Sequence, residues 1–423
     1  MQGEGVNLVP PQHTKSKASG KSYLKLPSQL YLFLKQLLYG SVIGIATGCA
    51  SALFLHLLDF STRTRNHYPA LLFMLPLAGV LCLELYRRYG KGTEAGNNLI
   101  LERIHEAEGD PIPFRMAPLV LICTLLTHVC GGSAGREGTA VQMGGAIAEG
   151  WGKLLRVTVS ERKWLLMAGV SGGFGAVFGT PLAGAVFGME VLEVGRLKIG
   201  AVVPCLVASV VGDRICRELG VIHHVYPAIS MPSLSLNLLS GSLIFGLLCG
   251  LIAKIFILLT HFIRDTLQKR VTPLWLHPVG GGLVVIGLVY ALHTRDYLGL
   301  SLGLIERSFT SGGVLPLAFA LKLLFTSITL GTGFRGGEVT PLFCIGATMG
   351  YTFAHIAHLP TPLFAALGFV AVFAGAAKTP LACFLLGMEL FGVSAGVLLL
   401  AVCVLSKIAS GKTGIYHAQR GKY

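Results

Sequence analysis

The chain has 423 residues, of which 53% are hydrophobic and 13% are charged, and its formal net charge is +14. Its mean hydropathy of +0.68 excludes an ordinary soluble domain, because such domains are less apolar and carry more charge. We therefore expect an integral membrane protein. Because the positive charge lies in tails and loops, it favours contact with lipid headgroups over binding of nucleic acid.

Both ends of the chain are polar and basic. The first 27 residues carry four lysines and lack the short apolar core and small-residue cleavage site of a signal peptide. The residues after Ala409 carry three Lys and Arg side chains and no acid. Positive charge beside membrane spans marks the cytoplasmic side. We therefore predict cytoplasmic tails at residues 1–28 and 411–423 and an even number of full crossings.

Apolar runs of different lengths fill most of the chain between these tails. They cover residues 36–58, 70–86, 117–130, 164–188, 199–211, 235–263, 278–292, 314–330, 341–357, 363–376 and 381–408. A helix needs about 20 residues to cross a bilayer, so some runs span it and others are too short. Short apolar helices are stable in a membrane only when their ends are buried in protein or face a water-filled cavity.

The second half of the chain repeats the first at a nearly constant distance. Residues 38–48 (LYGSVIGIATG) resemble 239–250 (LSGSLIFGLLCG), and residues 179–190 (GTPLAGAVFGME) resemble 378–389 (KTPLACFLLGME). Between them, the acid Glu137 matches Glu338. The common order predicts an internal duplication, with membrane repeats at 29–225 and 226–410, each with seven to nine helices. Sequence leaves the relative orientation open, but inversion would bring equivalent helix ends together at the midplane.

Glycine-rich turns precede the helices expected after Glu137 and Glu338. Glycine lets backbone N–H groups approach a ligand closely, and a helix start adds further N–H groups and a positive dipole end. The turns therefore predict an anion site formed by the backbone around Gly138, Val339 and Thr340. The alternative is that these glycines only allow tight helix packing, as we expect for Gly40, Gly44 and Gly48.

Two charged residues lie in the first of these turns. An acid at membrane depth is costly and indicates function. As a carboxylate, Glu137 can compete with the anion for the same N–H donors, and it can move aside when protonated, which would couple the anion to a proton. We expect Arg136 to be a structural partner or a source of positive potential, because a desolvated charge would bind the anion too tightly for turnover.

Two further candidates have simpler alternative interpretations. Asn97 and Asn98 precede an expected helix that opens with Leu99, so either amide could cap that helix or donate into a pore. Tyr416 follows a glycine turn near the end of the chain, and it is either an interfacial anchor or a pore residue. The histidines lack metal-ligand spacing, and we expect no metal, no cofactor and no enzyme activity.

These segments, in this order, resemble the CLC family of anion channels and proton-coupled antiporters, from Leu38 to Tyr416. The family's GREGP segment is matched by residues 135–139, its GGxFxP segment by 336–341, its APLAG segment by 180–184 and its pore tyrosine by Tyr416. The resemblance implies an all-helical subunit with the CLC fold and two inverted repeats. It also implies a homodimer in which each subunit has its own pore.

Four departures from the chloride-selective pattern indicate a different cargo. Asn97 takes the place of the serine in GSGIP, Thr139 replaces the proline of GREGP, Val191 stands at the internal proton-relay acid, and Glu338 replaces an apolar residue. This set resembles the fluoride-exporting branch of bacterial CLC antiporters. Fluoride is small and strongly hydrated, so its site should offer stronger or more numerous donors than chloride needs, as Asn and Thr side chains do.

The sequence thus predicts a homodimeric fluoride/proton antiporter of a bacterial inner membrane that exports fluoride and confers resistance to it. The resemblance implies that Glu137 is the external gate and proton carrier and that Glu338 is the second proton site. If Glu338 is not that site, Glu190 is the next candidate for it. The implied anion ligands are Asn97, Gly138, Thr139, Val339, Thr340 and Tyr416. A chloride or nitrate antiporter, or a passive anion channel of the same fold, remains the alternative.

Overall fold

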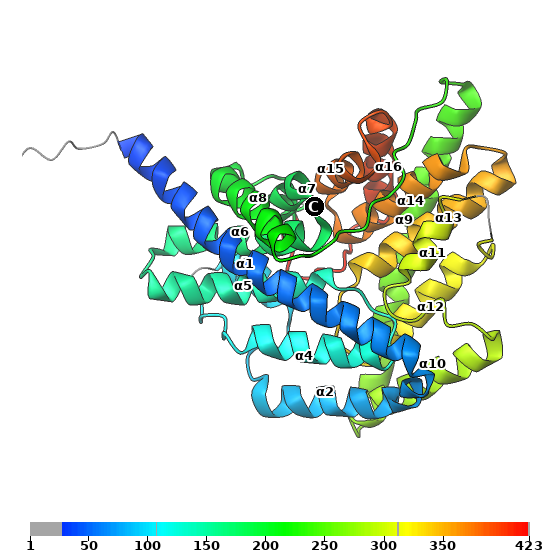
Figure 1. Ribbon diagram of the computed structural model, residues 1–423, viewed down its shortest axis with the longest axis horizontal. Coiled ribbons are helices and arrows are strands. Elements are labelled where there is room, and N and C mark those ends of the chain that lie inside the picture. Colours follow the sequence, from blue (N-terminus) through cyan, green and yellow to red (C-terminus); the bar gives the residue numbers. More distant parts are fainter. Residues whose placement is uncertain (1–27, 107, 311–312, 422–423) are drawn as a thin grey trace, which may run out of the picture.

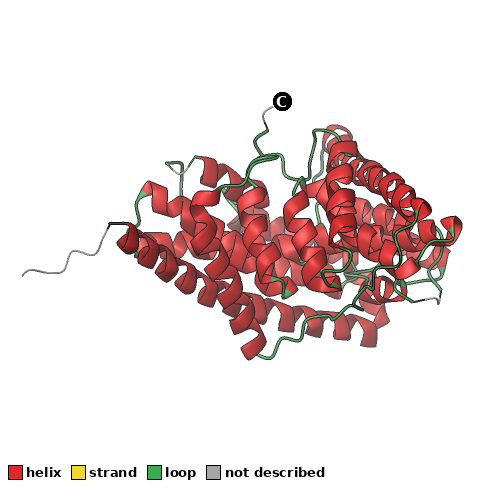
Figure 2. Ribbon diagram, turned by 90° about the horizontal axis from the view of Figure 1, so that it is seen from above, coloured by secondary structure: helices red, strands yellow, loops and turns green. Residues whose placement is uncertain are grey.

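The computed structural model describes residues 28–106, 108–310 and 313–421, and within these ranges the regular structure is almost entirely helical (Figure 1, Figure 2). The first half of the chain contains α1 (Ser28–His67), α2 (Leu75–Tyr89), α3 (Asn97–His105), α4 (Met116–Val129), α5 (Glu137–Leu154), α6 (Val159–Phe178), α7 (Pro181–Glu190) and α8 (Val202–Glu218). Short 3-10 helices, Pro69–Met74 and Ile199–Ala201, precede α2 and α8. Most of the predicted N-terminal tail, residues 1–27, and the last two residues of the predicted C-terminal tail, 422–423, lie outside the described residues.

The second half contains an equal number of α-helices in the part of the chain that the structure describes. They are α9 (Leu236–Arg270), α10 (Leu276–Leu292), α11 (Leu302–Arg307), α12 (Ala318–Gly331), α13 (Val339–Ala357), α14 (Thr361–Ala377), α15 (Pro380–Phe391) and α16 (Gly396–Ala409). In Figure 1 most helices of the first half lie on the left and those of the second half on the right, with α7 and α15 side by side between them.

The helices differ in length as the apolar runs predict. Among the described residues, five segments are long and apolar enough to cross a membrane: Ser28–His67, Pro69–Tyr89, Ile199–Glu218, Leu236–Arg270 and Val339–Ala357. Other apolar helices, including α4, α12 and α15, have fewer than 18 residues. Their ends therefore lie within the protein body, where turns and cavities can satisfy their free backbone groups.

Both halves use the same helix pairs. The pairs α1–α8, α5–α6 and α6–α8 of the first half correspond to α9–α16, α13–α14 and α14–α16 of the second, and all of them are in contact. Glycines permit the close approach of α1 to α8: a Cβ atom on Gly44 would lie 2.9 Å from the carbonyl oxygen of Ala208, and one on Gly48 would lie 2.7 Å from that of Gly212. The packing interpretation of this glycine stripe is confirmed.

A reciprocal pair of carboxylates joins the two halves. Glu190, at the end of α7, accepts two backbone N–H bonds of 3.0 and 2.7 Å from the first turn of α15. Glu389, near the end of α15, accepts two of 2.9 and 2.8 Å from the first turn of α7. Each acid neutralises the positive end of the other helix. Because the end of each helix meets the start of its partner, α7 and α15 run antiparallel.

Residues 411–421, hereafter the C-terminal segment, fold back onto the helical body. The N–H of Ile415 donates to the carbonyl of Ala376 at 2.9 Å, and that of Arg420 donates to the carbonyl of Leu192 at 3.1 Å. These bonds carry Tyr416 inside the molecule, where its side chain is 6% exposed. The predicted cytoplasmic tail is therefore a packed segment rather than a free extension over these residues.

Candidate functional site

The two glycine turns meet at the centre of the molecule. Gly135 and Gly337 exchange two backbone hydrogen bonds, of 2.6 and 2.8 Å. A Cβ atom on Gly337 would lie 2.8 Å from the backbone nitrogen of Gly138 and 3.0 Å from that of Glu137. Only glycine fits here, and its small size leaves the first backbone nitrogens of α5 open to the space beside it. The helix starts predicted from the sequence, at Glu137 and near Thr340, are confirmed.

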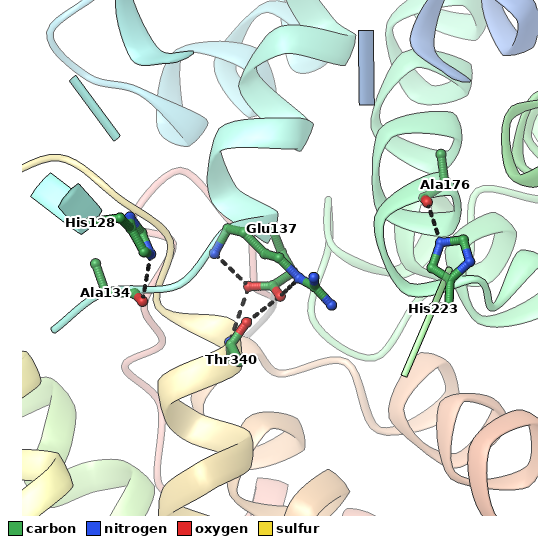
Figure 3. A network of polar contacts seen from close by, with 7 residues as sticks. His128, Ala134, Glu137, Ala176, His223 and Thr340 are labelled. Carbon is green, nitrogen blue, oxygen red and sulfur yellow. Dashed lines mark hydrogen bonds and ion pairs between the residues drawn. The ribbon is translucent and has the colours of Figure 1, made fainter. Parts of the chain in front are cut away.

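The carboxylate of Glu137 occupies this junction and is fully buried. It accepts hydrogen bonds from the backbone N–H of Arg136 at 3.1 Å and from that of Thr340 at 3.0 Å, and it also accepts one from the Thr340 hydroxyl (Figure 3). The acid therefore bridges the starts of α5 and α13. Backbone N–H groups at a helix start bind any small anion, so these donors become available whenever the carboxylate leaves.

A first cavity, of about 640 Å³, lies beside Arg136. The guanidinium Nε of Arg136 is 3.5 Å from a carboxylate oxygen of Glu137 and makes no hydrogen bond. Further arginines, Arg63, Arg65 and Arg295, line the same cavity together with Asp59 and Asp296. Its wall also includes His223, whose Nε2 bonds the carbonyl of Ala176 (Figure 3). Arg136 thus contributes positive potential to an aqueous approach to Glu137, one of the two roles that the sequence predicts.

A second cavity has a volume of about 210 Å³. Gly138 lines it, together with Asn97, Glu338 and Tyr416. Glu137 itself lines neither cavity, although its chain neighbours Arg136 and Gly138 line the first and the second. The structure therefore brings four of the predicted site residues to one cavity.

The two asparagines have separate roles, and neither caps α3. The helix begins at Asn97, with Gly96 in the capping position and no side-chain cap, so the capping alternative is wrong. The amide nitrogen of Asn97 would lie 3.1 Å from a Cβ on Gly138, while its amide oxygen is buried without a partner. The Asn98 oxygen accepts the N–H of Ala418 at 3.1 Å. Asn97 therefore faces the site, and Asn98 holds the C-terminal segment in place.

Glu338, in the turn before α13, and Tyr416, in the C-terminal segment, both line the second cavity. The Glu338 carboxyl makes no hydrogen bond or ion pair within the described ranges, and the charge of Arg264 acts on it. Tyr416 packs edge-on against Phe187, with ring centroids 6.4 Å apart. A buried ring at a cavity wall does not fit an interfacial anchor, and it agrees with the pore alternative.

Two predicted residues have different surroundings from those expected. The hydroxyl of Thr139 is 2.7 Å from that of Thr124, and Thr139 lines neither cavity. Val339 is buried, and the prediction for it concerns its backbone. Glu190 is held at the start of α15 rather than in a cavity.

Gln142 is a cavity residue that the sequence did not predict. It lies one helical turn after Gly138 and lines the second cavity. Its spacing from Gly138 is the signal that marks it, because residues four apart share a helix face. Among the described residues, no group of three or more His, Cys, Asp or Glu side chains could hold a metal ion.

Comparison with known proteins agrees with this geometry. Residues 77–411 match the family profile of voltage gated chloride channels. A chloride/fluoride channel protein of Pseudomonas syringae pathovar tomato is 43% identical over 412 residues, which cover 95% of this chain and 91% of that protein.

Solved structures share the fold along nearly the whole chain. The crystal structure of a CLC-type fluoride/proton antiporter has a TM-score of 0.89 at 32% identity, covering 94% of this chain and 100% of that one. A slow cyanobacterial Cl⁻/H⁺ antiporter has a TM-score of 0.77 at 22% identity, over 90% of this chain and 96% of that one. With these matches beside its helical architecture, the chain is a multi-pass membrane protein with the CLC fold, and it belongs to the CLC family of anion transport proteins.

Proposed function

We propose that this transporter is a fluoride/proton antiporter that exports fluoride from the cytoplasm in exchange for inward protons, and that it thereby confers fluoride resistance on a bacterium. The observation that carries the proposal is the Glu137 carboxylate, which accepts hydrogen bonds from the N–H and hydroxyl groups of Thr340. Its chain neighbours Arg136 and Gly138 line the first and the second cavity, respectively. The 43% identical relative is a chloride/fluoride channel protein, and the similar crystal structure is that of a CLC-type fluoride/proton antiporter. Both support fluoride as the transported anion.

Competition for the same donors provides the coupling. While Glu137 is ionised, it occupies the N–H groups of Arg136 and Thr340 and keeps an anion out. Protonation removes its negative charge, weakens those bonds and frees the donors for fluoride. When the proton leaves, the carboxylate returns and displaces the anion. The carboxylate and the anion therefore alternate at the same donors, which ties the protonation of Glu137 to the binding and release of the anion.

The remaining site residues supply the anion contacts and the second proton position. Asn97 offers an amide N–H₂ group beside Gly138, and Thr340 and Tyr416 offer hydroxyl groups. Fluoride holds its water tightly, so side-chain donors of this kind are needed to replace that water. Glu338, in the same cavity and without a hydrogen-bond partner among the described residues, is positioned to take the proton after Glu137.

We further propose that residues 29–225 and 226–410 are inverted repeats with both chain ends in the cytoplasm. The antiparallel contact of α7 with α15, and the antiparallel bridge of Gly135 with Gly337, support inversion. Gln36, near the start of α1, bonds the carbonyl of Gly200 at 3.3 Å. The nearby loop at 192–194 pairs with the C-terminal segment, which supports a common side for both ends.

A homodimer with one pore per subunit, in a bacterial inner membrane, completes the proposal. It rests on the family resemblance. Subunit counting by single-molecule photobleaching of labelled protein in liposomes tests it: two bleaching steps are expected, and a population with one step only would contradict the dimer.

Anion efflux from liposomes tests the cargo and the coupling together. Purified protein is reconstituted into liposomes loaded with fluoride, chloride or nitrate, and anion release and external pH are followed at once. We expect fluoride release accompanied by proton uptake, and chloride release at least tenfold slower. Equal rates for fluoride and chloride would replace the proposal by a chloride antiporter, and fluoride release without proton movement would replace it by a passive channel.

A further inference from the structure

Two histidines that the proposed mechanism does not use stand at the rim of the second cavity. His261 projects from α9, and His417 follows Tyr416 in the C-terminal segment; their ring centroids lie 4.6 Å apart, with the planes inclined by 30°. Both line the same cavity as Glu338. His417 is exposed, whereas Glu338 is partly buried and Tyr416 is buried. The pair therefore shares the cavity of Glu338 and has one member exposed to the outside.

Charged and titratable groups approach this pair from several elements. They are Arg264 and Asp265 of α9, Glu94 of the turn before α3, Arg335 and Glu338 of the turn before α13, and Tyr416 of the C-terminal segment. Among these groups and the pair, only the imidazoles change charge near neutral pH in their ordinary state. Two imidazole rings this close would repel each other if both were charged.

The position of Glu338 requires a nearby base that can take up its proton. A carboxyl at the wall of a narrow cavity must pass its proton to water or to another base before it can accept the next. A cavity of about 210 Å³ has room for several water molecules, but water is a weak base. Imidazole is the side chain that most often passes protons between a buried group and the solution.

We propose that His261 and His417 form a proton-exchange pair that moves protons between Glu338 and the solution at the second cavity. This inference rests on the proposed antiport and deepens it. In each cycle the Glu338 carboxyl loses its proton and becomes a carboxylate, and one imidazole gains it and becomes an imidazolium. The imidazolium then gives the proton to water or buffer, so no other reactant is required.

The test is chemical rescue of a variant that cannot titrate at the rim. The double variant His261→Gln, His417→Gln keeps polar side chains of similar length but carries no imidazole. In liposomes with weak buffer at pH 8 we expect its proton-coupled fluoride flux to fall at least threefold below wild type. Adding about 20 mM imidazole to the solution at the second cavity should restore most of the flux. His355→Gln, which changes an exposed histidine that lines neither cavity, serves as the control and should match wild type.

Other outcomes separate the two proposals. An unchanged flux in weak buffer across pH 6 to 9, or a reduced flux that imidazole does not restore, would overturn the role of the pair. Equilibrium fluoride binding by calorimetry should match wild type, and a loss of binding would mean that the histidines only hold the site together. If wild-type protein moves fluoride without protons, the antiport proposal fails first, independently of the double variant.

Discussion

At the scale of single residues, one acid explains why an apolar chain keeps charge in its centre. Glu137 has no full counter-charge in hydrogen-bond contact. Instead, two backbone N–H groups and the Thr340 hydroxyl donate hydrogen bonds to its carboxylate and stabilise it. Arg136 stays at 3.5 Å and faces the first cavity. Neutral donors bind an anion reversibly, whereas a buried cation would hold it. Under the proposed function, these neutral donors allow the site to release its anion.

Replacement of Glu137 by Gln should abolish proton coupling. The amide oxygen can still accept the N–H of Thr340, but the side chain cannot take up or release a proton at any working pH. We expect proton flux at background level, with fluoride binding retained within about threefold. Simultaneous fluoride-electrode and pH recordings on liposomes measure both quantities. Proton movement coupled to fluoride in this variant would refute the role of Glu137 as the gate.

Glu338 and Glu190 offer a matched pair of acids for locating the second proton site. Glu338→Gln should reduce proton transport at least tenfold, because its carboxyl is free to exchange protons in the second cavity. Glu190→Gln should leave the ratio of protons to fluoride unchanged, because its carboxylate is held by two backbone N–H groups of α15. The opposite result in the two variants would move the proton site to Glu190.

Asn97 tests the origin of selectivity. Asn97→Ser shortens the donor that lies beside Gly138 and leaves a gap suited to a larger anion. One hydrogen bond is worth about 1 kcal/mol, so we expect the fluoride-to-chloride flux ratio to fall roughly fivefold. Asn237→Ser is the control, because that residue is exposed at the start of α9 and lines neither cavity. An unaltered ratio in Asn97→Ser would place the selectivity elsewhere.

At the scale of helices and turns, local signals in the sequence predict where two helices at the candidate site begin. Glycine turns followed by an acid or threonine predict the starts of α5 and α13, because both features act within a few residues of each other. The start of α3 differs, since Asn97 lies inside the first turn and Gly96 takes the capping position. Asparagine is common at helix caps, so its position alone does not separate the two arrangements.

The contact between the two turns should tolerate no side chain at Gly337. A Cβ there would lie 2.8 Å from the nitrogen of Gly138, in the backbone of a neighbouring helix that cannot move aside. Gly337→Ala should therefore abolish fluoride transport and lower the melting temperature in detergent. Gly280→Ala places a methyl group where no atom lies within 4 Å and should behave as wild type. Normal transport in Gly337→Ala would mean that the turns are further apart than the structure shows.

The reciprocal carboxylates between α7 and α15 should contribute to stability rather than to transport chemistry. Glu389→Gln replaces one acceptor oxygen by an amide N–H₂ group that faces a backbone N–H of α7. Hydrogen bonds to charged groups are worth about 1.5–3 kcal/mol, so we expect the free energy of unfolding to fall by about that amount. Thermal unfolding followed by fluorescence measures the change, and an unchanged melting temperature would contradict it.

At the scale of the whole molecule, the duplicated order of motifs in the sequence agrees with the equal number of described helices in each half and with their matching helix pairs. The inward path of the C-terminal segment and the contact of His261 with His417 could not be predicted. They join separate segments of the chain, Ile415 with Ala376 and Arg420 with Leu192, by contacts that leave no local pattern. The pairing of the Thr139 hydroxyl with that of Thr124 could not be predicted either.

Uphill proton movement driven by a fluoride gradient tests the central claim most directly. Liposomes that contain wild-type protein receive a fluoride gradient at equal pH on both sides, with the membrane potential held at zero by potassium and valinomycin. Fluoride leaving the liposomes should drive protons inward and create a pH gradient, which Glu137→Gln abolishes. Fluoride release with no change in internal pH would contradict coupled exchange and leave a passive anion channel.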